Sequence, residues 1–219
     1  MRVRVGVSVL AMVCALAAPA AAQEPAPAAG SGPSLHGRVF GWGDFQQMSA
    51  RDSFEAVSGE SIVSGLGGGL EVHRLWRGVF LRGSISRQSV AAERVFVFDG
   101  SVFALGIPLD VTMTPIELGA GWRFGPLGGR VVPYIGAGAL WLGYREDGAG
   151  TSSSEDVSET YSGATIFGGI DVSVWRFVSA GAEVAWRTAQ VKDAGGVFEA
   201  FGENNLGGIS FRLMLSVGK

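Results

Sequence analysis

Nine titratable residues occupy alternate positions within short apolar stretches of the sequence. They are Glu71, His73, Arg82, Glu117, Arg123, Asp171, Glu183, Arg187 and Arg212. The four acids and four arginines balance in charge. If they share one enclosed space, they can line a path for ions or pair with one another and fill it. We expect the second arrangement, in which the acids and arginines pair with one another inside that space. We call these nine residues the lumen charge network.

Signals for catalysis, metal binding or a cofactor are few. The two histidines, His36 and His73, have no partner at a metal-ligand spacing. The glycine clusters at 65–69 and 136–138 do not complete a phosphate-binding motif, and no G-x-S-x-G motif occurs. The single cysteine, Cys14, lies in the apolar N-terminal stretch. We therefore expect no enzyme activity, no cofactor and no metal, with His73 acting as a polar lining residue.

The first 34 residues have the features of a targeting segment followed by a linker. Residues 1–22 combine an arginine-containing start, an apolar stretch and three small residues that end at Ala22, as in a secretory signal peptide. Residues 23–34 are rich in Pro, Ala and Gly, which predicts an extended linker. We expect an exported protein that begins at Gln23 and has one folded domain over residues 35–219.

Apolar and polar residues alternate with a period of two through that domain, which predicts β-strands. In residues 207–218, for example, Phe211 and Leu213 share one face and Arg212 lies on the other. The pattern predicts eight strands, over residues 35–46, 66–75, 79–88, 116–124, 134–144, 161–175, 180–188 and 207–218. Short connections alternate with long ones at 47–65, 89–110, 145–160 and 190–205. This arrangement predicts an all-β fold, an eight-stranded antiparallel up-and-down barrel.

The less apolar face decides between a soluble barrel and a transmembrane barrel. The chain has 35 glycines, and its two lysines, Lys192 and Lys219, lie outside the predicted strands. A solvated exterior favours Lys, Thr and Ser, whereas glycine in a narrow interior makes room for long Arg and Glu side chains. We therefore expect the apolar face to contact lipid. A soluble periplasmic ligand-binding barrel is the alternative.

Aromatic residues near the short connections fit the same interpretation. They are Trp76, Trp122, Phe124, Tyr134, Trp175 and Phe177. Aromatic girdles mark the membrane surfaces of transmembrane barrels, so we expect these side chains to form one.

Four segments carry a resemblance to a known family. They are PIELGAGWRF at 115–124, PYIGAGA at 133–139, FGGIDV at 167–172 and AGAEVAWRT at 180–188. From residue 35 onward the chain resembles the small eight-stranded bacterial outer-membrane β-barrels of the outer membrane protein A, W and X type. The resemblance implies an integral protein of the bacterial outer membrane, and it says little about biochemical role.

Three classes of function stay open at this point. We expect a barrel with a largely plugged lumen that serves envelope structure or surface interaction through its long loops. A narrow channel for small hydrophobic or ionic solutes is the second class, and a lipid-modifying enzyme that uses His73 is the third.

The expected partners follow from location and charge. They are outer-membrane lipid, the envelope assembly machinery, and surface ligands at loops such as the acidic stretch 146–156. The formal net charge of −3 argues against nucleic acid. We expect a monomer.

Overall fold

The computed structural model describes residues 36–76, 78–98, 101–125, 129–148, 157–191 and 197–218, except the side chain of Arg74. The strands are β1 (His36–Met48), β2 (Ile62–Trp76), β3 (Val79–Phe98), β4 (Ser101–Arg123), β5 (Val131–Gly148), β6 (Val157–Trp175), β7 (Val178–Ala189) and β8 (Gly208–Gly218). The helices are α1 (Arg51–Ser58) and α2 (Val197–Phe201). The predicted signal peptide and linker lie outside the described residues.

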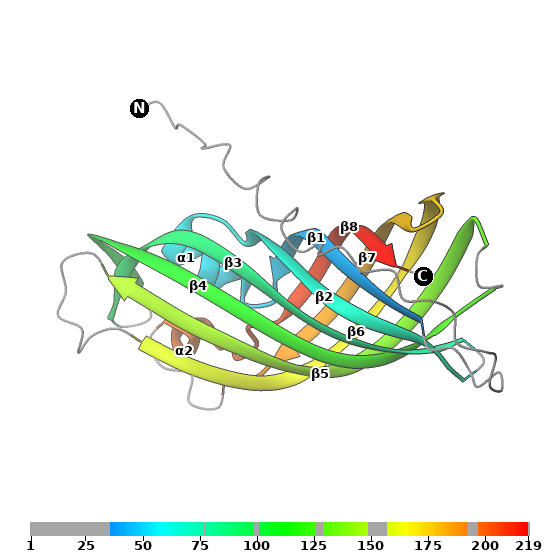
Figure 1. The fold of residues 1–219 in the computed structure, drawn as a ribbon. Helices are drawn as coiled ribbons and strands as arrows, with labels where there is room; N and C mark the ends of the chain where they lie inside the picture. The colour runs from blue at the N-terminus through cyan, green and yellow to red at the C-terminus, as the bar shows by residue number, and fades with distance from the viewer. Residues whose placement is uncertain are drawn as a thin grey trace, which may run out of the picture. The chain divides into compact units, whose positions relative to one another are not determined.

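The strands close into one barrel (Figure 1). Each strand is antiparallel to its neighbours in the chain, and β1 pairs with β8, from Arg38 opposite Gly218 to Met48 opposite Gly208. Every strand therefore has a partner on both sides over at least part of its length, which removes most of the sheet edge. The predicted eight-stranded up-and-down barrel is confirmed.

Side chains are distributed inside-out relative to a soluble protein. In β8, Leu213 is 54% exposed, while the adjacent Arg212 and Met214 are buried. The same alternation exposes Val39, Leu118 and Ile170 on other strands. Water would penalise such a surface by about 25 cal/mol per Å². An apolar exterior with a charged interior is the distribution that a transmembrane barrel requires.

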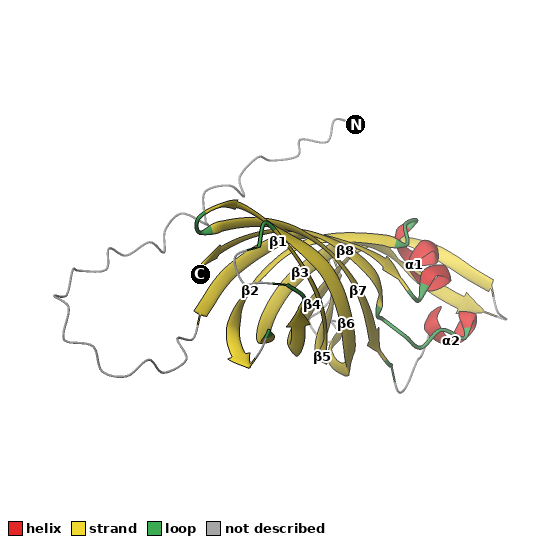
Figure 2. Cartoon of the chain, turned by 90° about the vertical axis from the view of Figure 1, so that its right-hand side faces the viewer, coloured by secondary structure: helices red, strands yellow, loops and turns green. Residues whose placement is uncertain are grey.

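The two ends of the barrel differ. At the turn end, Gly78 joins β2 to β3 with a φ of 95°, a conformation that glycine adopts without steric cost. At the other end, α1 connects β1 to β2 and α2 connects β7 to β8 (Figure 2). We call this the helix end. Neither described helix is long and apolar enough to cross a membrane.

Two of the predicted long connections contain strand that the sequence pattern did not predict, and the segment 89–110 is largely strand. In the segment 89–110, β3 continues to Phe98 and β4 starts at Ser101, with Val97 opposite Val102. A register shift between Glu93 and Val95 interrupts the alternation there, so the sequence pattern failed. In the segment 145–160, β5 extends to Gly148 and β6 starts at Val157.

The extra strand length forms a one-sided wall at the helix end. Pairing of β2 with β3 stops at Gln88, and pairing of β6 with β7 stops at Gly163, whereas β3 to β6 continue past these points. We call residues 89–98, 101–112, 142–148 and 157–162 the extended wall. Both helices lie at the barrel end from which this wall projects (Figures 1 and 2).

Candidate functional site

The interior of the barrel contains charged side chains in three clusters along its length. In the turn-end cluster, Arg38 contacts Glu71 at 3.0 Å and Asp171 at 2.7 Å. Arg123 contacts the same two acids at 2.7 Å and 2.6 Å. Two arginines and two acids therefore alternate in a closed ring. His73 Nδ1 lies 2.9 Å from Glu71 Oε1 at its edge.

The central cluster is built around Glu183 on β7. Arg82 contacts this carboxylate through both terminal nitrogens, and Arg212 Nη1 donates to it at 2.7 Å. Tyr134 OH also donates to Glu183, at 2.9 Å. Arg212 Nη2 donates to Glu117 at 2.6 Å, so it links the central cluster to the next one.

The helix-end cluster joins Arg187 to Glu117 and Asp44. Arg187 Nε donates to Glu117 at 2.7 Å, and its Nη1 donates to Asp44 at 3.1 Å. Ser210 Oγ and Gln88 Nε2 also donate to Asp44, at 2.6 Å and 3.1 Å. Every carboxylate in the three clusters thus accepts bonds from at least two donors, which offsets the cost of its burial.

All nine residues that the sequence predicted for the lumen lie in these clusters, each no more than 8% exposed. Sequence reasoning missed Arg38 and Asp44, which bring the buried set within the described residues to five arginines and five acids. Their positions share the inward face of β1 with Phe40 and Trp42. Because that face mixes aromatic and charged side chains, alternation alone did not separate it from the exterior.

Aromatic rings separate the arginines inside the barrel. The Arg82 guanidinium carbon lies 4.6 Å from the centre of the Phe40 ring and 4.8 Å from that of Phe167. Arg123 lies 5.0 Å from the Tyr134 ring, and Arg212 lies 5.1 Å from the Trp42 ring. Cation–π contacts of this kind stabilise desolvated guanidinium groups.

Several interior glycines make room for aromatic rings of the lumen, Phe80 among them, which corrects the role expected of these glycines. A Cβ atom at Gly136 would lie 2.4 Å from the Phe167 ring, and one at Gly121 would lie 2.4 Å from the Phe80 ring. We expected glycine to make room for Arg and Glu side chains. Gly181 comes nearest to that expectation, since its Cβ would lie 2.6 Å from a charged lumen side chain, at Asp171 Oδ1.

Tyr134 was also assigned wrongly. It is 3% exposed and bonds to Glu183 in the lumen, so it is not part of an aromatic girdle. The other five predicted girdle residues are exposed at or next to the turn end: Trp76, Trp122, Phe124, Trp175 and Phe177. Nearness to a turn does not distinguish a lumen position from a surface position. The alternation along β5 does, because Tyr134 falls on the inward face of this strand.

An apolar cluster closes the interior at the helix end. It includes Met48, Phe54, Val63, Val111, Met113, Leu140 and Leu206. Phe54 of α1 meets Phe198 of α2 at 6.5 Å between ring centres. The Glu203 carboxylate accepts the Asp52 and Ser53 amides at 3.2 Å and 2.9 Å, which ties the start of α1 to the β7–β8 connection. We call this cluster, with the two helices, the apolar cap.

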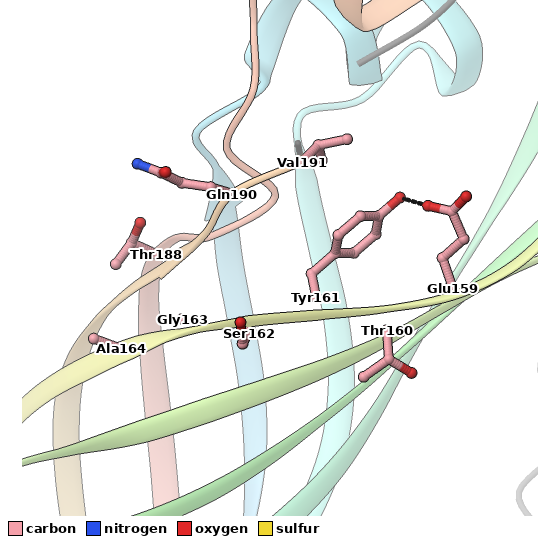
Figure 3. Close-up of a pocket in the computed structure, with 9 residues that line it drawn as sticks. All are labelled: Glu159, Thr160, Tyr161, Ser162, Gly163, Ala164, Thr188, Gln190 and Val191. Atoms are coloured by element: carbon pink, nitrogen blue, oxygen red, sulfur yellow. Dashed lines mark hydrogen bonds between the residues drawn. The ribbon is translucent and has the colours of Figure 1, made fainter. Parts of the chain in front are cut away.

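Two recesses open at the helix end, outside the charge network. One, of about 570 Å³, lies where β7 stops while β6 continues, between Tyr161 and Glu159 of β6 and Gln190 and Val191 (Figure 3). Tyr161 OH donates to Glu159. The second lies between the extended wall and the helices. In the described part of the chain, no group of three or more His, Cys, Asp and Glu side chains is placed to hold a metal ion.

Comparison with known proteins supports the fold. No protein-family model and no curated protein sequence matches this chain. Neisserial surface protein A superposes with a TM-score of 0.52 at 13% identity, over 84% of this chain and 96% of that one. A major outer membrane protein from Thermus thermophilus gives a TM-score of 0.52 at 10% identity, over 85% and 100%. The chain therefore has the fold of the small bacterial outer-membrane β-barrels, and its exterior is apolar, as the lipid-facing surface of a transmembrane barrel must be.

Proposed function

We propose that this protein is a closed, non-conducting barrel that serves the outer membrane as a structural and surface-interaction protein, without enzyme activity. The observation that carries the proposal is the continuous filling of the interior. Five arginines and five acids occupy the barrel from the turn end to Asp44, and the apolar cap follows directly.

A conducting path would need charges that are accessible to solvent, and these charges are buried. Arg187, Arg212 and Glu183 are each at most 1% exposed, and their partners are other side chains of the barrel. Eight-stranded barrels have interiors that side chains fill, unlike the wide water channels of larger barrels. The network therefore supports a plug in preference to a narrow channel.

The extended wall supports a role at the membrane surface. A transmembrane strand needs about 9–11 residues, whereas β3 has 20 and β4 has 23. The surplus lies at the helix end, which faces the outside in this architecture because long excursions are extracellular. Near the tip of the wall, Phe96, Phe98 and Phe103 are all more than half exposed. Exposed apolar groups gathered in this way are typical of interaction surfaces.

Lipid, surface ligands and the assembly machinery are the partners that this role implies, and the closed barrel supports a monomer. Since β1 pairs with β8, the barrel needs no second chain to complete its sheet.

Ion flux across protein-containing vesicles tests the proposal. Folded protein is reconstituted into lipid vesicles, its folded fraction is checked by the heat-dependent shift of its mobility on a gel, and release of trapped ions is measured. We expect the rate of protein-free vesicles. Faster release that scales with the folded fraction would contradict the closed role and favour the narrow channel.

A further inference from the structure

A cleft of about 450 Å³ lies at the helix end between the extended wall and the two helices. Its walls are mainly apolar and come from both helices and from β3, β4, β5 and β6; they include Phe54 and Val57 of α1, Leu105 and Leu109 of β4, Val95 of β3 and Phe198 of α2. Cavities that bind small molecules typically measure about 300–1,000 Å³ and have largely apolar walls with a few polar groups. The cleft has the size and the surface of such a site.

The base of the cleft is shared with the apolar cap. Leu109, Val111 and Tyr144 line the cleft and also belong to the buried cluster that closes the barrel. A molecule in the cleft would therefore rest on the cap and stay separate from the lumen charge network. This separation makes the cleft a second site, distinct from the plug.

Two carboxylates edge the cleft. Glu93 and Glu146 line it, and neither forms an ion pair within the described part of the chain. Glu146 Oε1 accepts a hydrogen bond from Tyr144 OH at 2.6 Å, which fixes this carboxylate beside the apolar wall. Arg94 also lines the cleft, but it is engaged in an interaction of its own. With Arg94 counted against the two carboxylates, the charged side chains that line the cleft sum to a net charge of −1.

A buried hydroxyl adds a polar group in the wall. Ser53 lines the cleft and is 1% exposed, and its Oγ has no hydrogen-bond partner among the described residues. The Ser53 amide already donates to Glu203, so only the hydroxyl is unsatisfied. Buried polar groups without partners are rare in proteins, and such a group is often completed by a ligand or water.

We propose that this cleft binds a cationic amphiphile, a molecule with an apolar chain or ring system and a protonated amine. The apolar part packs between α1, α2 and the wall, and the amine lies near Glu93 and Glu146. The same two carboxylates disfavour a fatty acid, because like charges would meet at the edge. This proposal names a ligand class for the proposed surface role. It rests on that role, because the role places the helix end, and with it the cleft, on the outer side of the membrane.

Native mass spectrometry of the detergent-solubilised full chain tests the proposal with three probes that share one alkyl chain. They are dodecylamine, dodecanol and dodecanoate. We expect dodecylamine to bind most tightly and dodecanoate least. Glu93→Gln and Glu146→Gln should each weaken dodecylamine binding by up to about five-fold, the range of a partly exposed ion pair, and should leave dodecanol binding unchanged.

Two variants provide the controls. Asp147→Asn removes an acid next to Glu146 that is already paired with Arg145 at 2.9 Å and does not line the cleft, so it should not change binding. Val57→Trp should fill the cleft and weaken all three probes. Equal binding of amine and carboxylate, or binding that Val57→Trp does not reduce, would overturn the proposal. Ion flux reports separately on the closed role, so a conducting barrel that still binds the amine would refute only that role.

Discussion

Neutralising Glu183 is the sharpest test of the lumen network, because this carboxylate has three separate donors. Arg82, Arg212 and Tyr134 all bond to it, and it is 1% exposed. Glu183→Gln would leave the interior with one uncompensated positive charge. Removing one partner of a buried pair typically costs about 3–5 kcal/mol. We expect a loss of that size in the free energy of unfolding, measured by urea titration in lipid vesicles with tryptophan fluorescence.

The double variant Arg82→Met/Glu183→Gln restores the balance of charge and keeps Arg212 paired with Glu117. It should therefore cost less than the sum of the two single changes, by about 1–3 kcal/mol of coupling. Arg38 bonds to Glu71 and Asp171 and has no contact with Glu183, so Arg38→Met with Glu183→Gln should show a smaller coupling. Full additivity in the first pair would refute the account of Arg82 and Glu183 as partners.

The remaining predictions concern the exterior, the glycines and the orientation. Leu213→Arg places a charge on the lipid face and should cost about 2–4 kcal/mol near the bilayer midplane, measured by the same unfolding titration; a change below about 0.5 kcal/mol would argue against lipid there. Gly136→Ala should destabilise by about 1–3 kcal/mol, since its Cβ would meet the Phe167 ring. Gly43→Ala is the control, because nothing lies within 4 Å of its Cβ. In intact cells, a membrane-impermeant maleimide should label Ser101→Cys at the helix end and leave Arg176→Cys at the turn end unlabelled; the reverse pattern would invert the topology.

The strand pattern was predictable because each barrel strand has one lipid face and one interior face. This difference places Glu117 and Arg212 on the interior face from parity alone. Parity does not give register, so it could not show that Arg212 joins Glu183 to Glu117. Partners across the lumen come from strands far apart in the sequence, and their choice depends on the closed geometry of the barrel.

The helix end was less predictable because both faces of the chain are apolar there. Val63, Met113 and Leu140 point into the cap from the inward faces of their strands. Closer to the turn end, the inward faces carry charged residues. The sequence does contain a signal for the pairing of β3 with β4: the dipeptide Asp99-Gly100, outside the described residues, is of a type common in hairpin turns and lies between two runs of Val and Phe. The register shift after Glu93 hides this hairpin from a strict count of alternate positions.

The central claim is that the apolar face meets lipid while the charges lie inside. A nitroxide spin label at Leu213→Cys in reconstituted protein tests it directly, through the relative access of oxygen, which concentrates in the bilayer, and of a water-soluble nickel complex. The exposed position of Leu213 on β8 predicts high oxygen access and little collision with nickel. The opposite result, strong nickel access with weak oxygen access, would place this face in water and contradict the inside-out barrel.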